Sequence, residues 1–167
     1  AIDRWTDGGR LPLVIDATSC ALGLYEDVLP TIDEARRPVL MDSIAWAHDE
    51  LLEALPAPRK VGRVAVHPPC SSRHLGLDHR LESLAGHLAD EVDVPISATC
   101  CGFAGDRGML HPELPAAALA PEAAELAGTH HDAALCSNRT CEIGLQQSTG
   151  EAFASFVFLL EAATRPA

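Results

Sequence analysis

Short runs of apolar and β-branched residues alternate along the chain with longer segments in which apolar residues recur at helical spacing. The short runs predict β-strands, which are Leu11–Ala17, Val61–His67, Asp93–Ala98 and Ala133–Ser137. The longer segments predict helices over residues 32–55 (with a break at Pro38), 75–89, 115–127 and 151–163. Strands that alternate with helices are typical of βαβ crossovers. We therefore expect an α/β fold, a parallel sheet flanked by helices in a Rossmann-like three-layer arrangement.

Cysteines follow the ends of the predicted strands. Cys20, Cys70, Cys100, Cys101 and Cys141 lie at or shortly after such ends. Ligands of open parallel α/β sheets bind just beyond the carboxyl ends of the strands. Because thiolates hold iron–sulfur clusters and soft metals, the pattern predicts a metal or cluster site at this edge of the sheet.

The adjacent pair Cys100 and Cys101 is followed by Gly102. Neighbouring cysteines do not easily form a disulfide with each other, because one trans peptide bond holds their Cα atoms closer than a disulfide favours. Both can point at a multinuclear cluster, and a glycine lets the backbone approach an inorganic core or turn with positive φ. The pair therefore favours a ligand set over a secreted disulfide framework.

An eight-residue segment near the N-terminus is echoed near the C-terminus. Residues 17–24 (ATSCALGL) align with residues 138–145 (NRTCEIGL) and share the cysteine, the glycine and the final leucine. Both segments lie where a predicted strand meets a helix, whose N-terminus favours a thiolate. We interpret residues 1–60 as the end of a first half-repeat with linking helices, and residues 61–167 as a second half-repeat with a C-terminal helix. Together they are expected to form one compact domain, a fragment of a duplicated one whose first half begins before residue 1.

The excess of acidic side chains disfavours negatively charged partners. The chain carries 24 acidic and 12 basic side chains, a formal net charge of −12, which argues against nucleic acid and against an anionic membrane surface as partners. No run of about 18 apolar residues is present to span a bilayer. Six cysteines without a signal peptide indicate a cytoplasmic protein, with any position at the inner face of the membrane provided by its partners.

Four segments carry a resemblance to a known family. They are HPPCSSRHLGL (67–77), CCGFAGDRGMLHPEL (100–114), LAPEAAE (119–125) and SNRTCEIGL (137–145). They resemble the cysteine-rich CCG domain of heterodisulfide reductase subunits and of the C-terminal region of FAD-linked D-lactate dehydrogenases that carry Fe–S centres. The similarity is greater to the dehydrogenase branch. The first sixty residues match mainly through DATSC and MDSIAWAHDELL.

The resemblance implies a ligand set with one departure. In the family a cysteine is followed by Cys-Cys-Gly and then by Cys-x-x-Cys, and this chain has the same order at similar spacing. Asn138 replaces the first cysteine of the last element, which argues against a five-cysteine noncubane cluster. Cys70, Cys100, Cys101 and Cys141 still suffice for a [4Fe–4S] cluster.

Neighbouring residues are expected to support that cluster. Cys20 is a candidate helper ligand, and His67, Gly102, Gly105 and Asn138 are candidates for contact with the cofactor. An imidazole can ligate or hydrogen-bond a thiolate, and backbone amides that donate to the sulfurs would set the reduction potential.

Cys136 is interpreted as a core residue. It lies on a predicted strand two residues before Asn138, where alternation would send its side chain to a different face from the ligands.

The function that the resemblance implies is electron transfer. An FAD domain in the full protein would oxidise a D-2-hydroxy acid such as D-lactate, and a ferredoxin-like domain and this one would pass electrons to an acceptor. These partners would lie in the same chain or in separate subunits. The full-length protein is thus expected to be an FAD- and Fe–S-dependent oxidoreductase, whereas this fragment alone is not expected to be catalytic.

Three alternatives stay open from the sequence. A zinc site with structural or regulatory role could use the same four cysteines, and zinc could also replace the cluster in an isolated fragment. A thiol–disulfide module could cycle one cysteine against the adjacent pair without any metal. A degenerate scaffold could dock partners and bind no metal.

Overall fold

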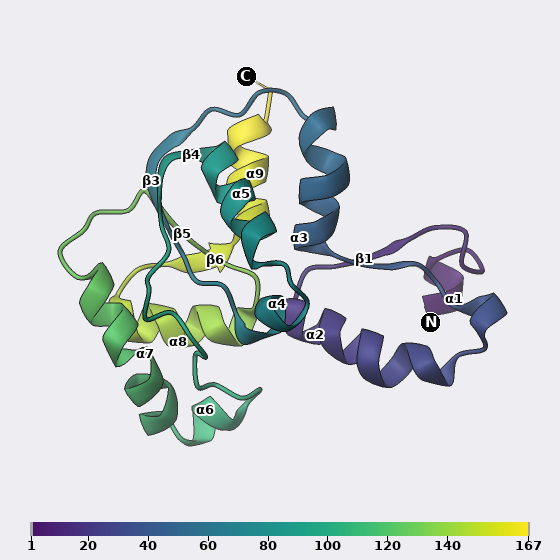
Figure 1. Ribbon diagram of the computed structural model, residues 1–167, viewed down its shortest axis with the longest axis horizontal. Coiled ribbons are helices and arrows are strands. Elements are labelled where there is room, and N and C mark those ends of the chain that lie inside the picture. The colour runs from purple at the N-terminus through teal and green to yellow at the C-terminus, as the bar shows by residue number, and fades with distance from the viewer. Residues whose placement is uncertain (1, 167) are drawn as a thin grey trace.

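Parallel β-strands form the centre of the molecule in the computed structural model, which describes residues 2–166 (Figure 1). The strands are β1 (Leu13–Ile15), β2 (Leu40–Asp42), β3 (Val61–Val66), β4 (Ala89–Asp93), β5 (Ala133–Cys136) and β6 (Phe153–Ser155). β1 pairs with β2, and the other four form a sheet in the order β4-β3-β5-β6, with every pair parallel. The predicted α/β fold with parallel strands is confirmed.

Helices connect consecutive strands. The α-helices are α1 (Ile2–Trp5), α2 (Thr18–Gly23), α3 (Ser43–Trp46), α4 (Cys70–His74), α5 (Asp78–Leu88), α6 (Arg107–Leu110), α7 (Glu113–Leu126), α8 (Arg139–Thr149) and α9 (Phe156–Thr164). Shorter π and 3-10 turns are η1 (Leu24–Val28), η2 (Leu29–Thr31), η3 (Glu34–Arg36), η4 (Ala47–Leu51) and η5 (Leu52–Ala54). Within residues 2–166, none of the helices has the length and apolar character needed to cross a bilayer.

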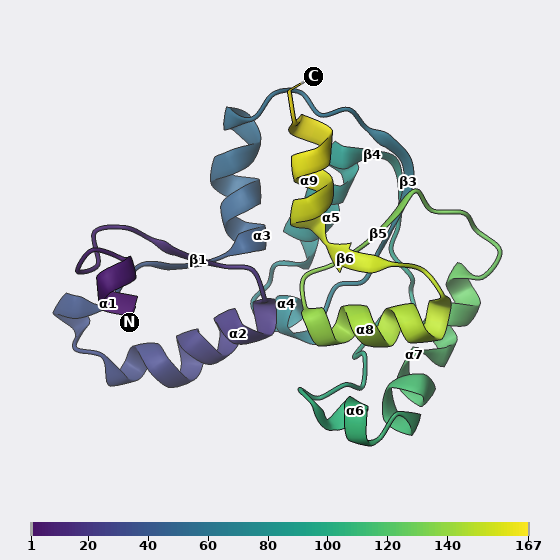
Figure 2. The same ribbon diagram turned by 180° about the vertical axis from the view of Figure 1, so that it is seen from behind.

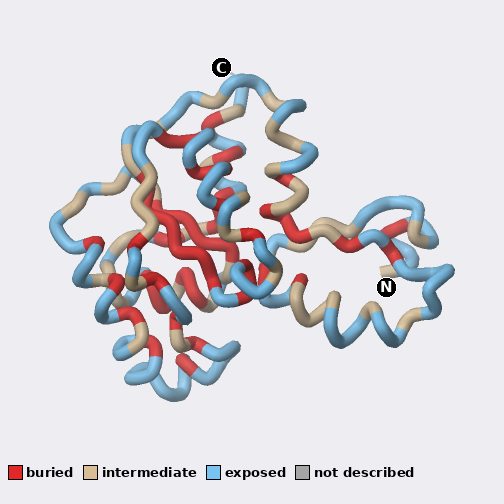
Figure 3. The backbone as a smooth tube through the Cα atoms, viewed as in Figure 1, coloured by how far each residue is buried: buried red, intermediate tan, exposed pale blue. Residues whose placement is uncertain are grey.

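Both faces of the four-stranded sheet are covered (Figures 1 and 2). Val64 and Leu135 pack with α5 and α9 on one face, while Ala65 and Ala134 pack with α7 and α8 on the other. This arrangement follows from the alternation of side chains along β3 and β5. Most of the buried residues lie in this body of the molecule, and the N-terminal part is largely exposed or half-buried (Figure 3).

The strand predicted over residues 93–98 is misplaced, because β4 ends where that prediction begins. Pro95 has no N–H to donate to a sheet. The next two amides, those of Ile96 and Ser97, donate to the carboxylate of Glu125 at 2.8 and 3.0 Å instead of to a neighbouring strand.

Two predicted helices turn out to contain a short strand. β2 lies within the helix predicted over 32–55, and β6 lies within the one predicted over 151–163. Asp42 and Ser155 end these strands, and each accepts a hydrogen bond from the backbone amide two residues later. Both side chains are therefore N-caps that separate strand from helix.

Polar contacts at the strand ends join the two-stranded sheet to the four-stranded sheet. Asp16, which follows β1, accepts hydrogen bonds from the hydroxyls of Ser43 at 2.9 Å and Ser155 at 3.1 Å. The amide of Thr18 donates to the carbonyl of Ser137 at 3.1 Å, and the two hydroxyls are 2.7 Å apart. The carboxyl ends of β1 and β5 are thus held side by side.

The buried carboxyl of Asp42 should make the stability of this joint depend on pH. Burial raises its pKa to about 6, although the hydrogen bond from Ile44 acts in the opposite direction. Because the folded-state pKa lies above the unfolded one, the unfolded chain releases its proton first as the pH rises. We expect the free energy of unfolding to fall between about pH 4 and pH 6, by on the order of 2 kcal/mol.

Asp42→Asn should remove this fall, since asparagine keeps the N-cap but does not ionise. Urea unfolding of both proteins across this pH range checks the expectation. Identical pH profiles for the two proteins would contradict it.

Candidate metal centre

Three segments that follow strands at the carboxyl edge of the sheet carry four of the predicted ligands. Cys70 is the first residue of α4, after β3. Cys100 and Cys101 lie in the loop between β4 and α6, and Cys141 lies in the first turn of α8, after β5. Adjacent parallel strands end at the same edge, which brings together cysteines that are far apart in the sequence.

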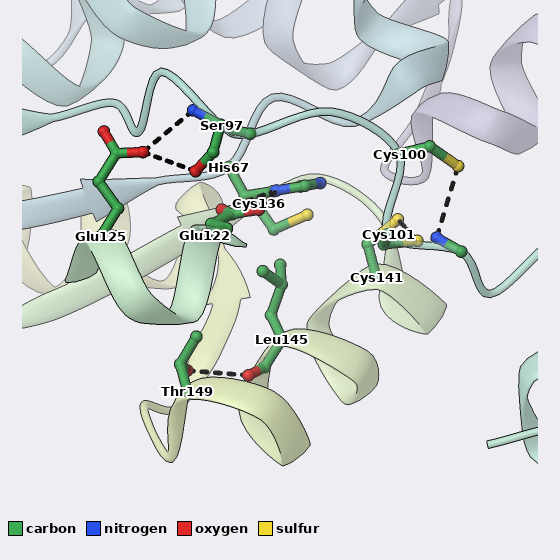
Figure 4. Close-up of polar contacts among 12 residues, drawn as sticks. His67, Ser97, Cys100, Cys101, Glu122, Glu125, Cys136, Cys141, Leu145 and Thr149 are labelled. Carbon is green, nitrogen blue, oxygen red and sulfur yellow. Dashed lines mark hydrogen bonds and ion pairs between the residues drawn. The ribbon is translucent and has the colours of Figure 1, made fainter. Parts of the chain in front are cut away.

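The four thiols form an outer and an inner pair. The Sγ atoms of Cys101 and Cys141 are 2.8 Å apart and both residues are buried (Figure 4). Cys70 and Cys100 are exposed, and Cys100 is close enough to Cys70 to help raise its pKa, after the larger effect of burial. The group therefore reaches from the protein surface into the core.

The inner pair holds its protons tightly in the metal-free protein. Hydrogen bonding to Cys141, and then burial, raises the pKa of Cys101 far above the ordinary range of a thiol. The same bond lowers the pKa of Cys141, but the neighbouring Cys136 and burial raise it further than the bond lowers it. Since metals bind thiolates, metal binding must release these protons, and affinity should increase with pH.

Phe103 anchors the loop that carries the cysteine pair. Its buried ring packs against Gly108 in α6 and Gly144 in α8, where a Cβ would come within 2.8 and 2.9 Å of ring atoms. Only glycine leaves room for the ring at these two positions, so the close packing fixes the loop over α8.

Gly102 and Gly105 differ in their surroundings although both have positive φ, +71° and +75°. A Cβ on Gly102 would lie 2.8 Å from Ala118 Cβ and 2.9 Å from the Leu114 carbonyl oxygen, whereas one on Gly105 would meet no atom within 4 Å. The Gly102 amide donates to Cys100 Sγ at 3.4 Å. No such bond to sulfur is found for Gly105 in the described part of the chain.

Asn138 is hydrogen-bonded to one of the clustered thiols, whereas Cys20, within the described chain, is not. The Asn138 side-chain amide donates to Cys141 Sγ at 3.4 Å, and its oxygen accepts from the Ser19 hydroxyl at 2.7 Å. Cys20 follows Ser19 in α2 and is exposed. Among residues 2–166 it shares no hydrogen bond with another cysteine.

His67 lies in the interior and pairs with a residue that sequence reasoning missed. Its Nδ1 is 2.9 Å from both carboxylate oxygens of Glu122, and the two side chains are 0 % and 1 % exposed. The buried positions of α7 are residues 115, 119, 122 and 126, spaced by three and four. This periodicity could have revealed Glu122 as a carboxylate on an apolar helix face.

Cys136 is a core residue, as predicted, but the prediction that it faces away from the ligands is wrong. It is fully buried and belongs to the same apolar cluster as Cys101 and Cys141. The reason is that α8 packs over the face of β5 to which Cys136 points, so that Cys141 lies above it.

The donor set fits a soft metal in kind, but the side chains do not yet lie at the positions of metal ligands. Within the described range, no group of three or more His, Cys, Asp or Glu side chains already has the spacing of a metal site. Two thiolates on one tetrahedral zinc-like ion lie about 3.8 Å apart, given bonds of about 2.3 Å. Cys101 and Cys141 would therefore have to separate by about 1 Å.

A parallel α/β sheet with cysteines gathered beyond its strand ends defines a cysteine-rich α/β domain. Residues 64–146 match the family model of the CCG cysteine-rich domain, and this match runs from the second half of β3 through most of α8. No curated protein matches the chain. The family resemblance inferred from the cysteine motifs is confirmed for this segment.

Proposed function

We propose that this chain is an electron-transfer module in which Cys70, Cys100, Cys101 and Cys141 hold a [4Fe–4S] cluster. The observation that supports this most is the gathering of these thiols from three separate segments, each after a strand, at one sheet edge. The match of the same segment to the CCG model points in the same direction. Such a cluster supplies one-electron transfer when bound.

The chain's own residues would orient the thiolates and tune them. The backbone amide of Gly102 donates to Cys100 Sγ, and the side-chain amide of Asn138 donates to Cys141 Sγ. Hydrogen bonds to ligand sulfur withdraw electron density and so favour the reduced state. These two donors are expected to raise the reduction potential.

The wider context is also part of the proposal. The resemblance supports a flavin-dependent dehydrogenase of D-2-hydroxy acids such as D-lactate, with an FAD domain and a ferredoxin-like domain as partners and a separate electron acceptor. In that arrangement the module is cytoplasmic. Residues 1–60 are the end of a first half-repeat with linking helices, and residues 61–167 are a second half-repeat with a C-terminal helix, in one domain. Substrate oxidation would take place on the FAD domain.

Metal analysis of protein purified without oxygen tests the cluster. We expect iron and acid-labile sulfide in equal amounts, near four of each per chain, with a broad visible absorption of thiolate-bound iron. Cys70→Ser and Cys100→Ser should each reduce both contents by more than half, because each removes an outer ligand. Cys20→Ser is the matched control and should leave both contents unchanged.

If the metal analysis finds zinc alone, or no metal, in the wild-type protein, the proposal of a cluster is wrong. Retention of full iron and sulfide by both serine variants would also contradict it.

A second candidate, thiol–disulfide exchange, is favoured by the 2.8 Å separation of Cys101 and Cys141. Forming that disulfide would join the two sulfurs and release two protons and two electrons to an oxidant such as a small-molecule disulfide. Loss of 2 Da, with about two fewer free thiols after exposure of the metal-free protein to such an oxidant, would support it.

A further inference from the structure

On the buried side of the four gathered cysteines, one imidazole nitrogen has no hydrogen-bond partner within residues 2–166. His67 is fully buried, and its Nε2 makes no hydrogen bond in the described structure. Burying a polar atom without a partner is destabilising. An atom of this kind beside a cluster of thiols points to a ligand.

Glu122 prepares that nitrogen to bind a metal. Its carboxylate lies 2.9 Å from Nδ1 through both oxygens, so Nδ1 carries the proton that the carboxylate accepts. The lone pair of Nε2 is then free. A histidine whose second nitrogen is held by a carboxylate is the usual arrangement for metal-binding imidazoles.

The sheet register places His67 next to Cys136. Val66 is paired with Leu135, and the His67 amide donates to the Leu135 carbonyl at 2.9 Å. The next residues of the two strands, His67 and Cys136, therefore project to the same face. Figure 4 shows the free edge of the imidazole on the side of the Cys136 sulfur, away from Glu122.

We propose that His67 Nε2 and Cys136 Sγ are the inner ligands of a single soft or borderline divalent metal ion that also binds Cys101 and Cys141. Three thiolates and one imidazole form a common tetrahedral ligand set for zinc-like ions. Binding of the ion would move the sulfurs of Cys101 and Cys141 apart by about 1 Å, as calculated above. This site does not require Cys70 or Cys100. Because it shares Cys101 and Cys141 with the cluster of the proposed function, the ion binds the cluster-free protein and the two are not present together.

Cobalt binding to the metal-free, reduced protein tests this site, because Co²⁺ replaces zinc and reports on its ligands through visible absorption. We expect one Co²⁺ per chain with an intense thiolate charge-transfer band and tetrahedral d–d bands. Cys136→Ser and His67→Gln should each weaken binding by at least about 100-fold and alter the d–d bands. Cys70→Ser and Cys100→Ser are the matched controls and should bind Co²⁺ as the wild type does.

Glu122→Gln keeps a similar shape and serves as the second variant if His67→Gln does not fold, as judged by its far-UV circular dichroism. A glutamine amide is a weaker, neutral acceptor and can also donate to Nδ1, so the proton is held less firmly on Nδ1 and Co²⁺ binding should weaken by about 10- to 100-fold. Two results would overturn the inner site: no Co²⁺ binding, or binding that depends on Cys70 and Cys100 and not on His67 and Cys136. The iron and sulfide contents of Cys70→Ser and Cys100→Ser test the cluster independently of this site.

Discussion

Gly102→Ala is expected to destabilise the protein by about 2 to 5 kcal/mol. An L-residue pays about 1 to 2 kcal/mol for a left-handed backbone conformation, and φ at Gly102 is +71°. The added methyl group would also overlap Ala118 and the Leu114 carbonyl of α7, and overpacking of this kind costs about 1 to 3 kcal/mol. Urea unfolding of the metal-free protein measures the change in the free energy of unfolding.

Gly105→Ala is the matched control, because φ is +75° there and the space around its Cβ position is open. It should lower the free energy of unfolding only by the cost of the left-handed backbone conformation, about 1 to 2 kcal/mol. Equal losses in the two variants would show that close contact with α7 does not constrain the glycine of the Cys-Cys-Gly motif.

Glu122→Ala is expected to cost about 3 to 5 kcal/mol, because it leaves His67 buried with neither ring nitrogen paired. The two residues are 55 positions apart in the sequence and tie α7 to the end of β3. Chemical denaturation at neutral pH measures this loss.

A double-mutant cycle separates the pair from the general effect of truncating α7. Replacing both residues with leucine fills the space with apolar atoms and leaves no polar group unpaired, so it should recover most of the lost stability. A double variant as unstable as Glu122→Ala would contradict this account.

The sequence predicted the sheet edge better than it predicted the interior. The last three residues of β3 and all of β5 form continuous apolar runs, so the ends of these strands, and the cysteines that follow them, could be located from the pattern alone. β2 and β6 have only three residues each, too few to show a period of two against the helices that follow them. Their boundaries depend on capping by Asp42 and Ser155.

The inner side of the site depends on packing between distant segments. Cys136 faces Cys141 because of the way α8 lies on β5, which strand alternation alone does not determine. Glu122 reaches His67 because α7 crosses the same face. Neither contact has a local signature, apart from the position of Glu122 on the buried stripe of α7.

The joint between the two sheets consists of directional hydrogen bonds at Asp16, Thr18 and Ser137, whereas the body around it is held by apolar packing. The residues of β1 are only half-buried, so releasing this strand exposes little apolar surface and requires less free energy than unfolding the body. The free energy of local opening at β1 is therefore lower than the free energy of unfolding the four-stranded sheet. Amide protons of β1 should exchange with solvent through partial openings, at denaturant concentrations where β3 and β5 are still fully protected.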